Sequence, residues 1–101
     1  MSAKNAVSGG LKLGKVAVSF KIMPADETMN LENIEEKLKK ELSRDFSLGK
    51  STIEEFAFGI KALRLIVIMN DEGGLIDRVE EKIRKHPEIG EVDVEEVSLI
   101  S

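Results

Sequence analysis

The sequence predicts a single α+β domain in which a four-stranded antiparallel sheet carries two helices on one face. Three observations support this prediction. Apolar residues follow strand and helix periods in the order strand, helix, strand, strand, helix, strand. The two strand–helix units are similar to each other, and no apolar run approaches the length of a membrane helix. We expect a flexible lead-in over residues 1–13 and one domain over residues 14–101.

The first strand is expected over KVAVSFKIMP, Lys15 to Pro24, where every second residue is apolar and Pro24 ends the pattern. A helix from about residue 31 to 44 follows, because Asn30 is a good N-cap and glutamates precede lysines along it. Its apolar stripe consists of Leu31, Ile34, Leu38 and Leu42.

The second strand is expected from Thr52 to Phe58, with Gly49 as a break before it and Gly59 as the turn after it. The run IKALRLIVIMN, residues 60–70, is apolar on both faces near its centre, which is typical of a central strand.

The second helix has its apolar stripe at Leu75, Ile76, Val79 and Ile83. His86 and Pro87 terminate it. In the last strand the alternation slips at Glu95 and Glu96, which predicts a β-bulge.

A weak internal repeat completes the prediction of the fold. Leu31, Ile34 and Leu38 fall on Ile76, Val79 and Ile83 at one constant shift along the chain. Two such strand–helix units, each followed by a further strand, form the ferredoxin-like βαββαβ sandwich. Its sheet has one face without helices, so we expect that face and the loop tips to make functional contacts.

The charge balance excludes some partners. The chain has 15 Lys and Arg against 19 Asp and Glu, a net charge of -4, which argues against direct nucleic-acid binding. It contains no cysteine, so no disulfide or thiolate metal site is possible. We expect a cytoplasmic protein that does not bind a membrane.

No pattern of catalytic residues is present. The sequence lacks phosphate-binding, dinucleotide-binding, zinc-protease and serine-hydrolase motifs. The single histidine, His86, ends a helix beside a proline and is interpreted as structural. The paired acids do not converge, the central strand has no aromatic residue for stacking RNA bases, and the loop after the first strand lacks the Arg of an acylphosphatase. We therefore expect no catalytic residue, metal or cofactor, and a binding protein rather than an enzyme.

Two stretches resemble the nucleotide-exchange domain of elongation factor one, beta subunit. KIMPADETMNLENIEEKLKK is similar to the family's first strand–helix unit, with Pro24, Asp26-Glu27-Thr28 and Asn30-Leu31 in place and Met29 as an extra residue. AFGIKALRL resembles the family's Gly-Phe-Gly-Ile-Lys-Lys-Leu signature, with Ala57 replacing the first Gly. The resemblance covers roughly Lys15 to Ile100, and the short chain without a long N-terminal extension looks archaeal.

The resemblance implies a ferredoxin-like fold and a guanine nucleotide exchange factor. Its partner would be the GTPase alpha subunit, the elongation factor that delivers aminoacyl-tRNA, and no covalent bond would change. In the family the Phe of this signature inserts into the GTPase, which implies partner contacts by Phe58, Gly59, Ile60 and Lys61. The alternative is that Phe58 covers the end of the core.

The C-terminus departs from the family pattern. Eukaryotic members place a Lys just before the last residue, where it reaches the magnesium site of the GTPase. Here the tail reads Ser98-Leu99-Ile100-Ser101, with Leu99 or Ser98 at the equivalent position. A tail lysine therefore cannot be assigned. Either another group acts, or exchange relies on wedging alone, or the activity is weak; we expect wedging by Phe58 and the surrounding surface.

A second family resemblance remains open. NDEGGLIDRVEEKIRKHPEIGEVDV resembles the strand–Gly-Leu–helix–strand phrase of amino-acid-binding ACT modules. This alternative implies a small-molecule-sensing regulatory module that dimerises through a sheet edge.

Overall fold

The computed structural model describes residues 14–100, and its elements follow the predicted order. The predicted lead-in, residues 1–13, lies outside the described residues. The elements are β1 (Lys15–Pro24), α1 (Leu31–Leu42), β2 (Ser47–Glu55), a short 3₁₀ turn (Ala57–Gly59), β3 (Lys61–Asn70), α2 (Leu75–Arg84) and β4 (Ile89–Leu99).

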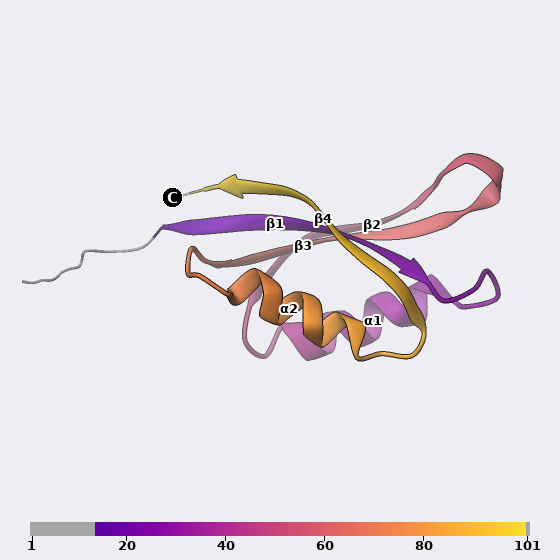
Figure 1. Ribbon diagram of the computed structural model, residues 1–101, viewed down its shortest axis with the longest axis horizontal. Helices are drawn as coiled ribbons and strands as arrows, with labels where there is room; N and C mark the ends of the chain where they lie inside the picture. Colours follow the sequence, from indigo (N-terminus) through magenta and orange to yellow (C-terminus); the bar gives the residue numbers. More distant parts are fainter. Residues whose placement is uncertain (1–13, 101) are drawn as a thin grey trace, which may run out of the picture.

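The sheet has the strand order β2-β3-β1-β4, and every neighbouring pair is antiparallel. Both helices lie beneath the same face of this sheet (Figure 1). This is the ferredoxin-like plan, so the predicted fold is confirmed. The two central strands, β1 and β3, pair without interruption from Lys15–Asn70 to Ile22–Leu63.

The core lies between the sheet and the two helices. Alternate residues of β1 and β3 point towards the helices, and the apolar stripe of each helix meets them. The fully buried side chains include Val18, Phe20, Ile22, Leu38, Leu42, Leu63, Leu65, Val67, Val79, Ile83 and Val92. Burial of this set supplies the main stabilising free energy of the fold.

Helix α1 begins as the sequence predicts and ends slightly earlier. The Asn30 side-chain oxygen accepts hydrogen bonds from the backbone N–H of Glu32 at 2.8 Å and of Asn33 at 3.3 Å. The helix ends at Leu42, with Ser43 as its C-cap, so the predicted end at residue 44 is two residues too long.

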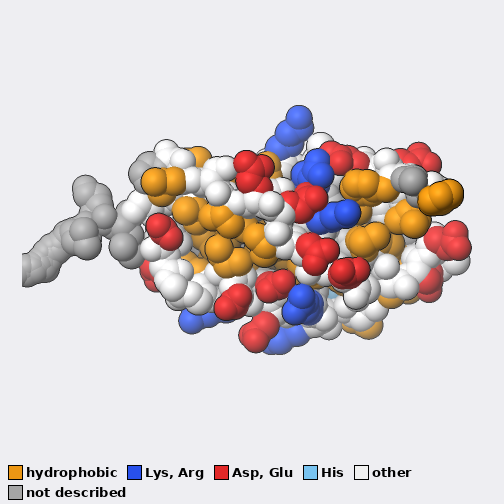
Figure 2. Space-filling model, turned by 45° about the horizontal axis from the view of Figure 1, so that its top comes forward, with side chains coloured by type: hydrophobic (Ala, Val, Ile, Leu, Met, Phe, Trp, Pro, Cys, Tyr) orange, Lys and Arg blue, Asp and Glu red, His pale blue; other side chains and the backbone are white. Residues whose placement is uncertain are grey.

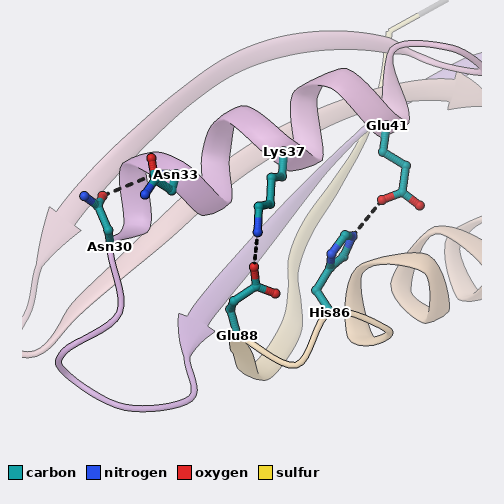
Figure 3. A network of polar contacts seen from close by, with 6 residues as sticks. All are labelled: Asn30, Asn33, Lys37, Glu41, His86 and Glu88. Atoms are coloured by element: carbon teal, nitrogen blue, oxygen red, sulfur yellow. Dashed lines mark hydrogen bonds and ion pairs between the residues drawn. The ribbon is translucent and has the colours of Figure 1, made fainter.

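Two polar contacts fasten α1 to the loop between α2 and β4 (Figure 3). Lys37 forms an ion pair with Glu88 and donates a hydrogen bond to its Oε2 atom. This hydrogen bond is the main reason that the pKa of Glu88 is lowered. The His86 Nε2 atom lies 2.6 Å from Glu41 Oε1. The lone histidine thus joins two structural elements, in agreement with its interpretation as structural.

Strand β2 differs from the prediction at both ends. It begins at Ser47 and ends at Glu55, so the predicted strand from Thr52 to Phe58 is wrong at its C-terminal end. Gly49, predicted to be a break, lies inside the strand. A Cβ there would meet Ile66 Cγ2 at 3.0 Å, so glycine allows the two strands to approach.

The predicted bulge in β4 is confirmed. Ser19 pairs with Glu96 while its neighbour Phe20 pairs with Val94, which leaves Glu95 as the extra residue. Glu95 turns towards the helix-free face of the sheet, where its carboxylate reaches Arg64 on β3.

Candidate functional site

The turn between β2 and β3 is closed by its own backbone. The N–H of Phe56 donates a hydrogen bond to the carbonyl oxygen of Ile60 at 2.6 Å, and the 3₁₀ turn Ala57–Gly59 lies between them. We call residues 56–60 the β2–β3 tip. The turn projects beyond the ends of the helices (Figure 1). A partner can therefore reach this tip without displacing any other element.

Phe58 stands at the end of the tip with its side chain 99% exposed. Its backbone lies in the left-handed region, at φ 64° and ψ 26°, and Phe58 is the single non-glycine residue with positive φ in residues 14–100. Gly59 follows with φ 74°. A left-handed conformation is unfavourable for a phenylalanine and fits glycine well. The alternative in which Phe58 covers the core is wrong, because the ring is in solvent.

The other predicted site residues adjoin Phe58. Ile60 is 48% exposed, and Lys61 is an exposed residue that begins β3 and pairs with Glu55. The structure therefore brings together all four predicted residues: Phe58, Gly59, Ile60 and Lys61. They present one aromatic ring, one aliphatic side chain and one cation at the same end of the sheet.

These four residues form one wall of a cleft of about 850 Å³. The opposite wall is the loop between β1 and α1, which lies across from the tip in Figure 1. The residues that line the cleft include apolar ones, such as Met29 and Ile53, and the acids Asp26, Glu27 and Glu32. The cleft thus offers both apolar and acidic side chains beside the exposed ring.

Asp26 orders the loop that forms the second wall. Its Oδ1 accepts a hydrogen bond from the backbone N–H of Thr28 at 2.8 Å and another from the Thr28 hydroxyl. The hydrogen bond from the Thr28 hydroxyl is the main cause of the lowered pKa of Asp26, and the bond from the Thr28 N–H adds to it. The carboxylate is therefore charged at neutral pH.

Sequence reasoning did not assign this loop to the site. The signal available was Asp26 two residues before Thr28, since an Asp followed by such a donor forms a local turn. The sequence does not show that residues 26–32 lie close to residues 58–61. The first segment leads from β1 into α1 and the second from β2 into β3, and only the fold brings them together.

The helix-free face of the sheet carries a charged band. Arg64 donates to Glu54 Oε2 at 2.6 Å and to Glu95 Oε1 at 2.8 Å, so one guanidinium connects β2, β3 and β4. The hydrogen bond that Arg64 donates to Glu95 is the main cause of the raised pKa of Arg64. Figure 2 shows hydrophobic areas on either side of a band of charged side chains.

No helix within residues 14–100 has the length and apolar character needed to cross a membrane. Over the same residues, no group of three or more His, Cys, Asp or Glu side chains is placed to hold a metal ion.

Two solved structures share the fold at low sequence identity. The ACT domain from the GTP pyrophosphokinase of Chlorobium tepidum matches with a TM-score of 0.58 and 13% identity, over 80% of this chain and 86% of that domain. Ribosomal protein S6 from Thermotoga maritima matches with a TM-score of 0.52 and 16% identity, over 86% and 88% of the two chains. At these identities the likeness shows the fold alone.

Sequence comparison with curated proteins is more specific. Elongation factor 1-beta of Thermoplasma acidophilum is 35% identical over 87% of this chain and the whole of that protein. The protein of the same name from Thermococcus gammatolerans is 41% identical, over 79% of this chain and 89% of its own length. The family described as EF-1 guanine nucleotide exchange domain matches residues 17–100. The chain therefore belongs to the EF-1 guanine nucleotide exchange domain family.

Proposed function

We propose that this chain promotes the exchange of GDP for GTP on the translation elongation factor GTPase that delivers aminoacyl-tRNA, the alpha subunit of elongation factor 1. The observation that carries the proposal is the fully exposed Phe58 ring, held by an unfavourable left-handed backbone at the tip. Membership of the exchange-domain family supports it. The function implies a cytoplasmic protein, and no covalent bond is made or broken.

The mechanism follows from reciprocal coupling. A factor that binds the nucleotide-free GTPase best must weaken nucleotide binding, and nucleotide must weaken binding of the factor to the same extent. Phe58 would insert into an apolar pocket of the GTPase, where an aromatic anchor concentrates binding energy. Ile60 and Lys61 would contact the surface around that pocket.

Residues 98–101, Ser98-Leu99-Ile100-Ser101, include no lysine. Leu99 and Ile100 are 70% and 51% exposed, and Leu99 pairs with Val16, at the end of β1 remote from the tip. We attribute exchange to wedging by Phe58 and its surroundings.

The test is a nucleotide-release experiment. The cognate GTPase is loaded with fluorescent GDP, and release is followed in excess unlabelled GTP with increasing amounts of this protein. Phe58→Ala should raise the half-saturating concentration about 30-fold or more, since an anchor residue contributes about 2 kcal/mol or more. Val97→Ala is the matched control, because Val97 is 50% exposed but pairs with Val18, away from the tip.

Retention of full exchange activity by Phe58→Ala would contradict the wedging mechanism. If the wild-type protein neither accelerates release nor binds the GTPase, exchange itself is wrong, and the small-molecule-sensing alternative gains support.

A further inference from the structure

We propose that Lys21 is a positioning residue that holds the β2–β3 tip in its binding orientation by clamping the ring of Phe56. The effect on exchange rests on the proposed function. The effect on the tip is independent of it and can be measured in the free protein.

The clamp is a cation–π contact between a central strand and the base of the tip. Lys21 Nζ lies 4.2 Å from the centroid of the Phe56 ring. Lys21 alternates with the buried residues Phe20 and Ile22, so it points to the helix-free face of the sheet. Strand β1 is paired on both sides, with β3 and β4, and therefore gives the ammonium a rigid base.

The ammonium is not committed to a carboxylate. Lys21 takes part in none of the ion pairs found within residues 14–100, although Asp93 is its direct partner on β4. Arg64, its partner on β3, binds Glu54 and Glu95 instead. Glu54 and Glu95 are thus paired with the guanidinium, and the Phe56 ring is the side chain that the Lys21 ammonium contacts.

Phe56 connects the clamp to the end of the tip. Phe56 is half-buried and its ring contacts the Lys21 ammonium, while its N–H donates to the carbonyl oxygen of Ile60 across the turn. Phe58 has no packing of its own, since its side chain is 99% exposed. Its direction therefore depends on the backbone of the turn, and one residue, Phe56, fixes that backbone from both its side chain and its amide.

Loosening this clamp should lower the fraction of molecules with a binding-competent tip. A reduced competent fraction raises the apparent dissociation constant but does not alter the complex once it has formed. The expected signature is a higher half-saturating concentration with an unchanged maximal rate of nucleotide release.

The test compares Lys21→Met with Lys15→Met. Both substitutions remove one ammonium from the same face of β1, but Lys15 pairs with Asn70, at the end remote from the tip. In Lys21→Met the half-saturating concentration should rise about two- to fivefold, the size of an exposed cation–π contact. Lys21→Arg should restore it, because a guanidinium also stacks on an aromatic ring.

A second readout uses the free protein. Nuclear magnetic resonance should show the ε-methylene protons of Lys21 shifted upfield by the Phe56 ring, and the order parameter of the Gly59 amide should fall in Lys21→Met but not in Lys15→Met. An unchanged Gly59 order parameter overturns the proposal, as does a looser tip with unaltered exchange. If wild-type protein has no exchange activity, the proposed function fails, and the Gly59 measurement still decides whether Lys21 holds the tip.

Discussion

At the scale of single residues, Phe58 combines two energetically unfavourable features. It exposes nearly its whole ring to water and adopts a backbone conformation that phenylalanine rarely occupies. Neither feature contributes to the stability of the free chain. Local strain that persists beside a fully exposed aromatic ring supports the proposed role of Phe58 in binding.

Replacing Phe58 should separate stability from activity. Phe58→Asn should raise the free energy of unfolding by about 1 kcal/mol, because asparagine tolerates the left-handed region. Phe58→Ala should leave the free energy of unfolding nearly unchanged. Alanine is as unfavourable as phenylalanine in the left-handed region, and the exposed ring buries almost no surface that could be lost. In both variants the half-saturating concentration for nucleotide release should rise about 30-fold or more. Urea unfolding measures the first effect, and destabilisation by Phe58→Asn would mean that the ring packs in solution.

At the scale of elements, the β2–β3 hairpin depends on close approach in its interior as well as on its turn. A Cβ at Gly49 would lie 3.0 Å from Ile66 Cγ2, which is too close for a methyl group, so the position suits glycine. The pairing of β2 with β3 is irregular between Leu48 and Ser51, which is where this approach occurs. The close pairing of the hairpin that carries the tip therefore depends on the absence of a side chain at Gly49.

Gly49→Ala should destabilise the domain by about 1 kcal/mol or more, as expected for overpacking against a half-buried isoleucine. Gly73→Ala is the control, because a Cβ there meets nothing within 4 Å and its φ is not positive. Thermal unfolding of the two variants provides the comparison. Equal stability of the two would show that β2 shifts to accept the extra methyl group.

At the scale of the whole molecule, the contacts between α1 and the α2–β4 loop join the two halves of the repeat. The pKa of Glu88 is lowered from 4.5, chiefly by its hydrogen bond from Lys37. A lowered folded-state pKa stabilises the protein above the unfolded value, and this contribution disappears as the pH falls through the folded value. The pKa of Asp26 is also lowered, by its hydrogen bonds from Thr28. This shift likewise stabilises the protein above the unfolded value of 3.8, and its contribution is lost at lower pH.

Lys37→Met should therefore reduce stability at pH 6 and have a smaller effect at pH 3, because Glu88 loses its charge as the pH falls through its lowered pKa. Urea unfolding at the two pH values tests this. Lys40→Met is the control, since it removes a lysine of the same helix that takes part in none of the ion pairs of residues 14–100. A loss of equal size at both pH values would show that packing of the Lys37 stem, rather than its charge, is responsible.

The sequence predicts the central strands and the helices well because their apolar periods are regular over many residues. It fails at β2, where Gly49 has a packing role that only the position of Ile66 explains. It also extends that strand to Phe58, because Phe56 and Phe58 imitate the alternation of a strand. The four tip residues follow from a local signature, whereas the facing loop at Asp26 depends on tertiary arrangement.

The irregularities of β2 and β4 have a consequence for the behaviour of the protein at high concentration. These two strands form the edges of the sheet, and each contains a break in register, between Leu48 and Ser51 and at Glu95. An edge with a continuous row of free backbone groups recruits strands from other molecules and leads to aggregation. The interruptions make both edges poor templates for such pairing, although the chain exposes a hydrophobic tip.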